Sequence, residues 1–373
     1  MAELKIIEHE NLQNIIAVLV GTRPGIIKMS PLIKELKRRQ INFFVIHAGQ
    51  HYSYNMDKIM FEQIKIDQPK YILKNTKKYK LHGAQTAEML KGIEKILIEE
   101  KPKILLVCGD ANFNFAGALA ARKLGIMVGH VESGLRSNDW KMPEEHNRVM
   151  IDHISEYLFT PTEENKNNLL KDNVKGKIYV TGNIIVDSVF ENLKIALSEN
   201  NILNKFKLDK KKYILITIHR EENVDNYENI NNILKGLNLI CEKYKEYKFI
   251  FPIHPRTLHR ITLFKIKNLR VIKPIGYLEF LNLLNNSKIV ITDSGGVQEE
   301  ACILKIPCVT VRNNTERPET VEIGANILSG TKSNNLLKSV GIMMDINIKW
   351  ENPYGDGTTS KKIVNILINE VLN

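Results

Sequence analysis

The segment Asp293-Ser294-Gly295-Gly296-Val297-Gln298-Glu299-Glu300 combines residue types suited to hold a phosphate and a ribose. It follows the apolar run Ile289-Val290-Ile291-Thr292, so we expect a buried strand that leads into a helix. Ser294 is a good helix cap, and the two glycines let a ligand approach the backbone. Unpaired N–H groups at the helix start attract phosphate, and Glu299 or Glu300 could hold ribose hydroxyls. A tight strand-to-helix turn without a ligand is the simpler alternative.

Three acids in the first half of the chain, Asp110, Glu132 and Glu144, follow predicted strands or open a predicted helix. Loops after the strands of a parallel sheet meet at one edge of the sheet, where ligands bind. Several carboxylates at such an edge are what proton transfer needs. Two simpler interpretations remain: Asp110 caps the following helix, or one of Glu144 and Glu145 only stabilises a helix start.

Basic and aromatic residues accompany both sets. Arg23 and Lys28, at the start of the first predicted helix, can face a phosphate, although Arg23 can also be a solvated loop residue. The donors suited to a diphosphate in the second half are His219, Arg220 and Arg317. Phe280 can stack on a base or pack in the core.

Composition excludes several classes of protein. At 373 residues the chain is too long for one core, so two domains are expected. The net charge of +11 comes from lysines spread along the chain without a long basic tract, which favours an acidic small substrate over nucleic acid. The four cysteines show no zinc spacing, so no metal site is expected. With no signal peptide and no apolar run near ~20 residues, we expect a cytoplasmic protein without a membrane partner.

Short β-rich runs alternate with amphipathic stretches, which predicts an α/β protein with two Rossmann-like, doubly wound parallel-sheet domains. The predicted strands are 15–20, 43–47, 104–108, 127–131, 157–159 and 178–180, then 213–218, 249–253, 269–272, 289–292 and 308–311. The predicted helices include 84–100, 112–124, 143–155, 226–246 and 333–345.

A Lys/Asn-rich change of composition places the domain boundary within 185–212. We therefore expect an N-terminal domain, 1–185, that carries the acids, and a C-terminal nucleotide-binding domain, 186–357. By analogy with twin-Rossmann proteins, a final helix, 358–373, packs back on the first domain. The motifs that follow strands should then converge on one interdomain cleft.

In motif content and order, residues 15–370 resemble the non-hydrolysing UDP-N-acetylglucosamine 2-epimerases. The resemblance is carried by the motifs Gly21-Thr22-Arg23-Pro24, Gly109-Asp110, His130-Val131-Glu132-Ser133-Gly134-Leu135-Arg136, Pro143-Glu144-Glu145-His146-Asn147-Arg148, His219-Arg220, Thr292–Glu300, Thr315-Glu316-Arg317-Pro318-Glu319 and Asn352-Pro353-Tyr354-Gly355-Asp356-Gly357. It implies the GT-B fold, a UDP-sugar substrate, no cofactor and a homodimer.

The resemblance also implies roles for single residues. The diphosphate would be held by Ser294, Gly295 and Gly296, with charge added by His219, Arg220 and Arg317. Glu300 would bind the ribose, and backbone near Phe280 the uracil. The catalytic set would be Asp110, Glu132, Glu144 and His219, with Arg23 and Lys28 as substrate-binding cations. Departures are Gly25, where many bacterial members have glutamate, and Ala111-Asn112-Phe113 in place of threonines.

The implied reaction is reversible inversion at C2 of the sugar. The C2 proton is not acidic, because the neighbouring anomeric carbon is no carbonyl. Anti elimination of UDP gives 2-acetamidoglucal, and re-addition of UDP with protonation on the other face inverts C2. This needs a stabilised leaving group and proton-transfer groups on two faces, and neither metal nor nicotinamide.

Other activities compete with this one. Gly49-Gln50-His51-Tyr52, Met142–Glu145 and His254-Pro255-Arg256-Thr257 also resemble epimerases of UDP-2,3-diacetamido-2,3-dideoxyglucuronate. The pair Arg317-Pro318 favours the N-acetylglucosamine substrate. A retaining GT-B glycosyltransferase would bind the same donor but would need an acceptor groove, and a hydrolysing epimerase would let water trap the glucal.

Overall fold

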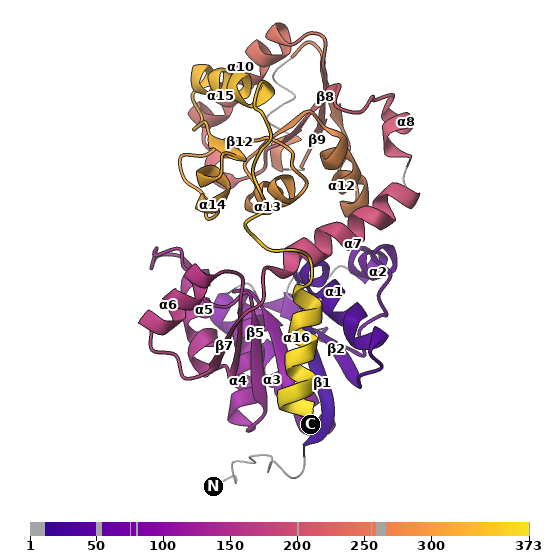
Figure 1. Ribbon diagram of the computed structural model, residues 1–373, viewed down its shortest axis with the longest axis vertical. Coiled ribbons are helices and arrows are strands. Elements are labelled where there is room, and N and C mark those ends of the chain that lie inside the picture. Colours follow the sequence, from indigo (N-terminus) through magenta and orange to yellow (C-terminus); the bar gives the residue numbers. More distant parts are fainter. Residues whose placement is uncertain are drawn as a thin grey trace. The chain divides into compact units, whose positions relative to one another are not determined.

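Parallel strands alternate with helices in both halves of the chain (Figure 1). The computed structural model describes residues 12–49, 54–74, 76–79, 81–199, 201–254, 256–258 and 266–372. The chain divides into a first unit, Met1–Ser188 with Tyr354–Asn373, and a second unit, Val189–Pro353. The division falls within one continuous helix, α7 (Ile184–Glu199).

Among the described residues, the first unit holds a seven-stranded parallel sheet in the order β3-β2-β1-β4-β5-β6-β7. Its strands are β1 (Gln13–Val20), β2 (Phe43–His47), β3 (Tyr71–Ile72), β4 (Pro102–Cys108), β5 (Met127–Val131), β6 (Tyr157–Thr160) and β7 (Lys177–Val180). Its other elements are α1 (Arg23–Arg38), α2 (Tyr54–Gln63), η2 (Thr76–Lys78), α3 (His82–Glu100), α4 (Asn112–Lys123), α5 (Pro143–Ile154), α6 (Glu163–Lys171), α16 (Thr359–Leu367) and η3 (Ile368–Leu372).

Within its described ranges, the second unit holds a six-stranded parallel sheet in the order β10-β9-β8-β11-β12-β13. Its strands are β8 (Tyr213–Thr217), β9 (Lys248–Pro252), β10 (Leu269–Ile272), β11 (Ile289–Thr292), β12 (Cys308–Thr310) and β13 (Asn326–Leu328). Its helices are α8 (Ile202–Phe206), α9 (Glu221–Val224), α10 (Tyr227–Lys243), α12 (Tyr277–Asn286), α13 (Gly295–Ile303), α14 (Pro318–Glu322) and α15 (Ser333–Met344).

Both sheets run outward in two directions from a central pair, β1 and β4 in the first unit and β8 and β11 in the second. Right-handed crossovers in opposite directions place helices on both faces. The central strands are therefore apolar on both sides, and Leu19, Leu105, Leu215 and Ile291 are fully or almost fully buried. The order reverses at the central pair, and open α/β sheets bind ligands beyond the strand ends at this point.

The doubly wound α/β prediction is confirmed, and most predicted strands and helices differ from the structure only at their ends. The sequence does not predict β3 and β13, because edge strands of two and three residues are too short to show a pattern. The single helix expected over 358–373 is wrong in detail, since α16 continues as the π-helical η3. Over the residues that the structure describes, no helix is long and apolar enough to cross a membrane.

The last helix belongs to the first unit through a buried aspartate. Asp187 of α7 accepts hydrogen bonds from the backbone N–H groups of Thr359 and Ser360, at 3.1 and 2.8 Å, and from the Ser360 hydroxyl at 2.6 Å. The N-cap residue of α16, Thr358, makes no capping bond with its own side chain. Asp187, which is distant in the sequence, thus caps the N-terminus of α16 in place of Thr358, and its carboxylate also complements the helix dipole.

We predict that Asp187→Ala lowers the free energy of unfolding by about 3 kcal/mol, because it leaves buried donors at the start of α16 without an acceptor. Urea denaturation measures this loss. The matched control is Asp356→Ala, since the exposed Asp356 accepts hydrogen bonds from Thr358 and pairs with the exposed Lys362 beside the same helix start. The control should lose at most about 1 kcal/mol. Equal losses in the two variants would contradict the assignment of the cap to Asp187.

Candidate functional site

Glu132 is a buried acid in a strained backbone conformation directly after β5. Its φ of +65° lies in the left-handed region, which costs a residue other than glycine about 1–3 kcal/mol. Its side chain is 5% exposed, and one carboxylate oxygen, Oε2, accepts a hydrogen bond of 2.7 Å from the Lys28 ammonium. The other oxygen, Oε1, is buried without a hydrogen-bond partner among the described residues. A buried polar atom of this kind indicates a position completed by a ligand.

The loop after β4 approaches the Glu132 carboxylate. Gly109 has a φ of +74°, and a Cβ atom on it would lie 3.6 Å from Glu132 Oε2. Glycine is suited to this position because it adopts a positive φ without strain. The next residue is Asp110, so the loop brings two of the predicted acids to neighbouring positions at the ends of adjacent strands.

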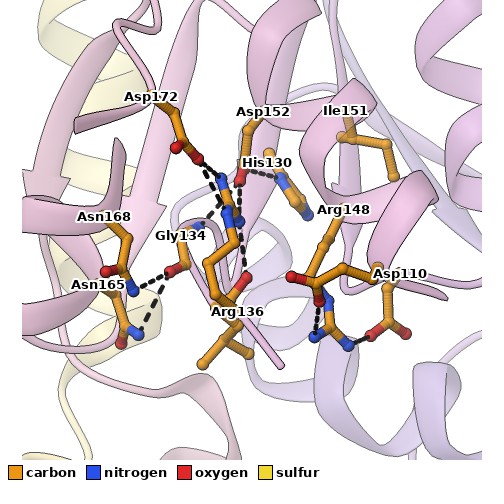
Figure 2. Close-up of polar contacts among 12 residues, drawn as sticks. Asp110, His130, Gly134, Arg136, Arg148, Ile151, Asp152, Asn165, Asn168 and Asp172 are labelled. Atoms are coloured by element: carbon orange, nitrogen blue, oxygen red, sulfur yellow. Dashed lines mark hydrogen bonds and ion pairs between the residues drawn. The ribbon is translucent and has the colours of Figure 1, made fainter. Parts of the chain in front are cut away.

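Asp110 does not cap α4. The N-cap residue of α4 is Ala111, which makes no side-chain capping bond, so the capping interpretation is wrong. The Asp110 carboxylate instead bonds to the guanidinium of Arg148 on α5, as Figure 2 shows. Asn147 donates to the Asp110 carbonyl oxygen at 2.9 Å, so α5 fixes both ends of this residue.

The structure separates Glu144 from Glu145. Glu145 is 3% exposed and accepts hydrogen bonds from the Ser137 amide at 2.9 Å and from Arg148 at 2.7 Å. The sequence left open which of the two glutamates has a purely structural role, and these contacts assign that role to Glu145. Glu144 lies exposed in the first turn of α5 and stays a candidate for chemistry.

The first helix of the chain supplies the predicted cations. Lys28 bonds to Glu132, while Arg23 is exposed at the first residue of α1. Phe113 packs directly against the loop before α1, because a Cβ on Gly21 would lie 2.7 Å from its ring. A Cβ on Gly25 would lie 3.5 Å from the same ring, so the two departures noted above, Gly25 and Phe113, are neighbours in the structure.

In the second unit a fully buried aspartate, Asp293, joins two loops. It accepts hydrogen bonds from the backbone N–H groups of His219 and Arg220, at 3.0 and 2.9 Å, and from the Asn223 amide at 3.1 Å. Asp293 follows β11, whereas the other three residues follow β8. Sequence reasoning did not assign a role to Asp293, although its place at a strand end was the available signal.

The start of α13 presents two glycines. A Cβ on Gly295 would lie 3.5 Å from Glu316 Oε2 and 3.9 Å from Arg220 Nη2, whereas none of the described atoms lies within 4 Å of a Cβ on Gly296. Ser294 occupies the N-cap position as predicted, but its hydroxyl makes no capping bond. Its N–H instead donates to Thr292 Oγ1 at 3.0 Å, because the residue keeps extended backbone angles.

The remaining predicted nucleotide-binding residues lie near the same helix. Arg317 pairs with the buried Glu299 of α13 at 2.7 Å. Glu300 is 8% exposed. Phe280, on α12, is half-buried and packs against a core cluster that includes Val297.

Burial and neighbouring charges shift two pKa values in this region. Burial lowers the pKa of His219 even though the Asp293 carboxylate opposes this effect, which favours the neutral ring. Burial acts to raise the pKa of Glu316, but hydrogen bonds of 2.9 and 3.0 Å from the Arg312 guanidinium outweigh it and lower this pKa to about 2. Glu316 is thus a fixed negative charge beside Gly295.

Some predicted positions lie outside the described residues, namely Gln50, His51, Tyr52 and Pro255 of the motifs after β2 and β9. Over the described ranges, His, Cys, Asp and Glu side chains form no group of three or more that could hold a metal ion. All four cysteines are buried.

Comparison with known proteins identifies the family. A family model described as UDP-N-acetylglucosamine 2-epimerase matches residues 34–368. The chain belongs to the UDP-N-acetylglucosamine 2-epimerase family. A UDP-N-acetylglucosamine 2-epimerase of Methanococcus maripaludis is 52% identical over 366 residues, which cover 95% of this chain and 98% of the relative. These matches confirm the family resemblance inferred from the motifs.

Solved structures confirm the fold. The crystal structure of Methanocaldococcus jannaschii UDP-GlcNAc 2-epimerase, in complex with UDP-GlcNAc and UDP, is similar with a TM-score of 0.84 and 51% identity, over 95% of this chain and 99% of that one. The structure of UGT2 from Phytolacca americana, complexed with UDP-2fluoro-glucose and pterostilbene, shares the fold alone, with a TM-score of 0.59 and 12% identity. The epimerase family member described here therefore has the expected GT-B fold.

A more distant relative bears on the substrate. The UDP-2,3-diacetamido-2,3-dideoxy-D-glucuronate 2-epimerase of Pseudomonas aeruginosa is 37% identical over 361 residues, which cover 94% of this chain and 99% of the relative. The alternative substrate considered in the sequence analysis thus appears in the name of a relative that is less similar to this chain than the Methanococcus maripaludis relative.

We predict that the pair of Glu316 and Arg312 stabilises the epimerase above about pH 5 and loses its effect as the pH falls towards 2. The folded-state pKa lies below the ordinary value, so protonation of Glu316 at low pH favours the unfolded chain. Glu316→Gln should cost about 2 kcal/mol at pH 7 and only about a quarter of that near pH 2.5, measured by urea denaturation.

The control for this prediction is Glu222→Gln, which removes the exposed partner of the same arginine. It should cost at most about 1 kcal/mol at pH 7. A penalty for Glu316→Gln that stays constant from pH 7 to pH 2.5 would contradict the assigned pKa.

Proposed function

We propose that the protein catalyses the reversible epimerisation of UDP-N-acetylglucosamine at C2, which gives UDP-N-acetylmannosamine. The carrying observation is the buried Glu132 carboxylate, which has one oxygen on Lys28 and the other without a partner among the described residues. The names of the two archaeal relatives, at 52% and 51% identity, support the choice of reaction and substrate.

The first step proposed is an anti elimination. The C2 proton passes to a carboxylate, the C1–O bond to UDP breaks, and the released electron pair of the C2–H bond forms the C1=C2 double bond of 2-acetamidoglucal. In the second step a phosphate oxygen of UDP adds to C1, and C2 receives a proton on its other face. Asp110, Glu132 and Glu144 are the proposed proton-transfer groups, because two faces of C2 need acids and bases on both sides.

The second unit is proposed to hold the nucleotide. The first-turn N–H groups of α13 at Gly295 and Gly296 suit the diphosphate, since no side chain of the glycines obstructs them. The Ser294 hydroxyl, which makes no capping bond, is proposed as a further donor to it. Arg220 lies beside Gly295 and can stabilise the departing diphosphate as its charge develops. This role is also assigned to His219 and Arg317.

The rest of the nucleotide is assigned by family resemblance. Glu300 is proposed to bind the ribose, and backbone near Phe280 the uracil. Arg23 and Lys28 are proposed as sugar-side cations. We also expect a cytoplasmic protein that forms a homodimer. Light scattering coupled to size-exclusion chromatography tests the dimer.

The second candidate substrate is UDP-2,3-diacetamido-2,3-dideoxyglucuronate, which the 37% identical Pseudomonas relative favours. Its additional acetamido group at C3 and its carboxylate would need further donors beside the sugar. The motif Thr315-Glu316-Arg317-Pro318-Glu319 and the higher identity of the archaeal relatives favour N-acetylglucosamine.

Proton NMR in D2O tests the function directly. With UDP-N-acetylglucosamine and no added metal or nicotinamide, we expect loss of the C2 proton signal and appearance of UDP-N-acetylmannosamine. Free N-acetylmannosamine with UDP would indicate the hydrolysing reaction instead. If the protein does not change UDP-N-acetylglucosamine but turns over the diacetamido-glucuronate, the second candidate is the substrate. If the C2 proton exchanges in neither substrate, the protein is not an epimerase.

We predict that Glu132→Gln and Asp110→Asn each lower kcat by about 100-fold or more, because they remove proton-transfer groups while preserving shape. Isothermal titration should find the affinity for UDP unchanged within about twofold. Glu163→Gln, an exposed change on α6 of the same unit, is the control and should keep full activity. Wild-type turnover in both acid variants would remove these residues from the mechanism.

We predict that Arg317→Ala weakens UDP binding by about 10- to 100-fold, the effect of losing one charge-assisted contact to phosphate. Arg270→Ala is the control, since Arg270 of the same unit donates to the Phe206 carbonyl on the protein surface. The control should bind UDP like the wild type. An unaltered UDP affinity in Arg317→Ala, with the fold verified by circular dichroism, would refute the assigned role.

A further inference from the structure

Asp152 is a fully buried carboxylate on α5 that holds the turn following Glu132. It accepts a hydrogen bond of 3.2 Å from the Gly134 amide and pairs with the Arg136 guanidinium at 2.7 Å. Its other oxygen lies 2.7 Å from His130 Nδ1 (Figure 2). Asp152 thus contacts residues on both sides of Glu132 in the sequence, His130 and Gly134, but among the described residues it forms no hydrogen bond or ion pair with Glu132 itself.

His130 extends this contact to the loop that carries Asp110. Its Nε2 atom lies 3.2 Å from the Gly109 carbonyl oxygen, and the ring is fully buried. Both partners of the ring, a carboxylate and a carbonyl oxygen, are acceptors. The ring therefore bridges the Asp152 carboxylate on α5 and the loop after β4.

Arg136 closes the network on its outer side. It bonds to Asp172 through two nitrogens, at 3.0 and 2.8 Å, and it is 8% exposed. Burial acts to lower the pKa of Arg136, but the carboxylates of Asp152 and Asp172 outweigh this effect and raise it, so the guanidinium stays charged. Within the described ranges, the Asp172 carboxylate pairs with Arg136 but forms no hydrogen bond with the turn itself, which makes Asp172 a matched comparison for Asp152.

The turn between these residues is fixed on several sides. Gly134 has a φ of +78°, and its carbonyl oxygen accepts hydrogen bonds from Asn168 at 3.0 Å and from Asn165 at 3.5 Å. The Ser133 amide donates to the Phe159 carbonyl oxygen at 3.2 Å. A left-handed glutamate persists only where its surroundings determine its conformation, and these contacts supply that constraint.

We propose that Asp152 and His130 are positioning residues of the epimerase. Together they fix the loop of Asp110 and the turn of Glu132 relative to each other, so that both acids reach the same sugar carbon. This inference rests on the proposed function. The alternative is that the buried charges only stabilise the first unit, as paired buried groups often do.

The test compares Asp152→Asn, His130→Gln and Asp172→Asn in the full-length protein. We expect Asp152→Asn to lower kcat by about 10- to 100-fold, because misplacing a reacting group by about 1 Å has this effect. The KM for UDP-N-acetylglucosamine and the affinity for UDP should stay within about twofold. His130→Gln should lower kcat about tenfold, since its shorter side chain keeps only one of the two contacts. Asp172→Asn should remain near wild type.

Hydrogen–deuterium exchange gives a readout that is independent of activity. We expect faster exchange in peptides covering 107–115 and 129–138 for Asp152→Asn and His130→Gln, with the rest of the first unit unchanged. Asp172→Asn should not show this local change. If Asp152→Asn does not fold, His130→Gln decides the question with the same two readouts.

Three outcomes would overturn the inference: kcat unchanged in both Asp152→Asn and His130→Gln, an equal loss of kcat in Asp172→Asn, or faster exchange across the whole first unit. Failure of the proposed function is distinct, because it appears as absence of C2 exchange in the wild-type protein. The exchange measurement still decides in that case whether Asp152 and His130 hold the two loops.

Discussion

In each unit a fully buried aspartate holds two loops at the carboxyl ends of neighbouring strands, and the candidate site depends on these two carboxylates. Asp152 contacts the turn after β5 and, through His130, the loop after β4. Asp293 joins the loop after β11 to the loop after β8. A buried carboxylate without its donors is costly, so the loops that supply the donors are held in place.

Two of the proposed acids, Asp110 and Glu132, are paired with cationic side chains. Lys28 bonds to Glu132, and Arg148 bonds to both Asp110 and Glu145. These pairs orient the carboxylates without side-chain rearrangement, which is the condition for effective proton transfer at a fixed geometry. The Glu132 oxygen Oε1 lies among these pairs without a hydrogen-bond partner from the described residues.

The fold could be predicted from the sequence because buried strands and amphipathic helices carry strong local patterns. The acids could be found because they follow those strands. The partners of the acids could not be predicted, since Arg148 contacts Asp110 only through the packing of α5. The cap of α16 could not be predicted either, because the Asp187 carboxylate lies far from this helix in the sequence. For the same reason, the sequence could not separate Glu144 from Glu145 or show that the Ser294 hydroxyl makes no capping bond.

The return of the chain to the first unit after Pro353 has a consequence for synthesis on the ribosome. The second unit is one uninterrupted stretch, Val189–Pro353, whereas the first unit lacks α16 until the residues after Pro353 emerge. Domains of a growing chain fold as units when their residues are available. The second unit can therefore complete its fold while the first unit, although its strands are made earlier, still lacks its last helix. A nascent chain that stops after Pro353 would leave the Asp187 carboxylate without the helix that it caps.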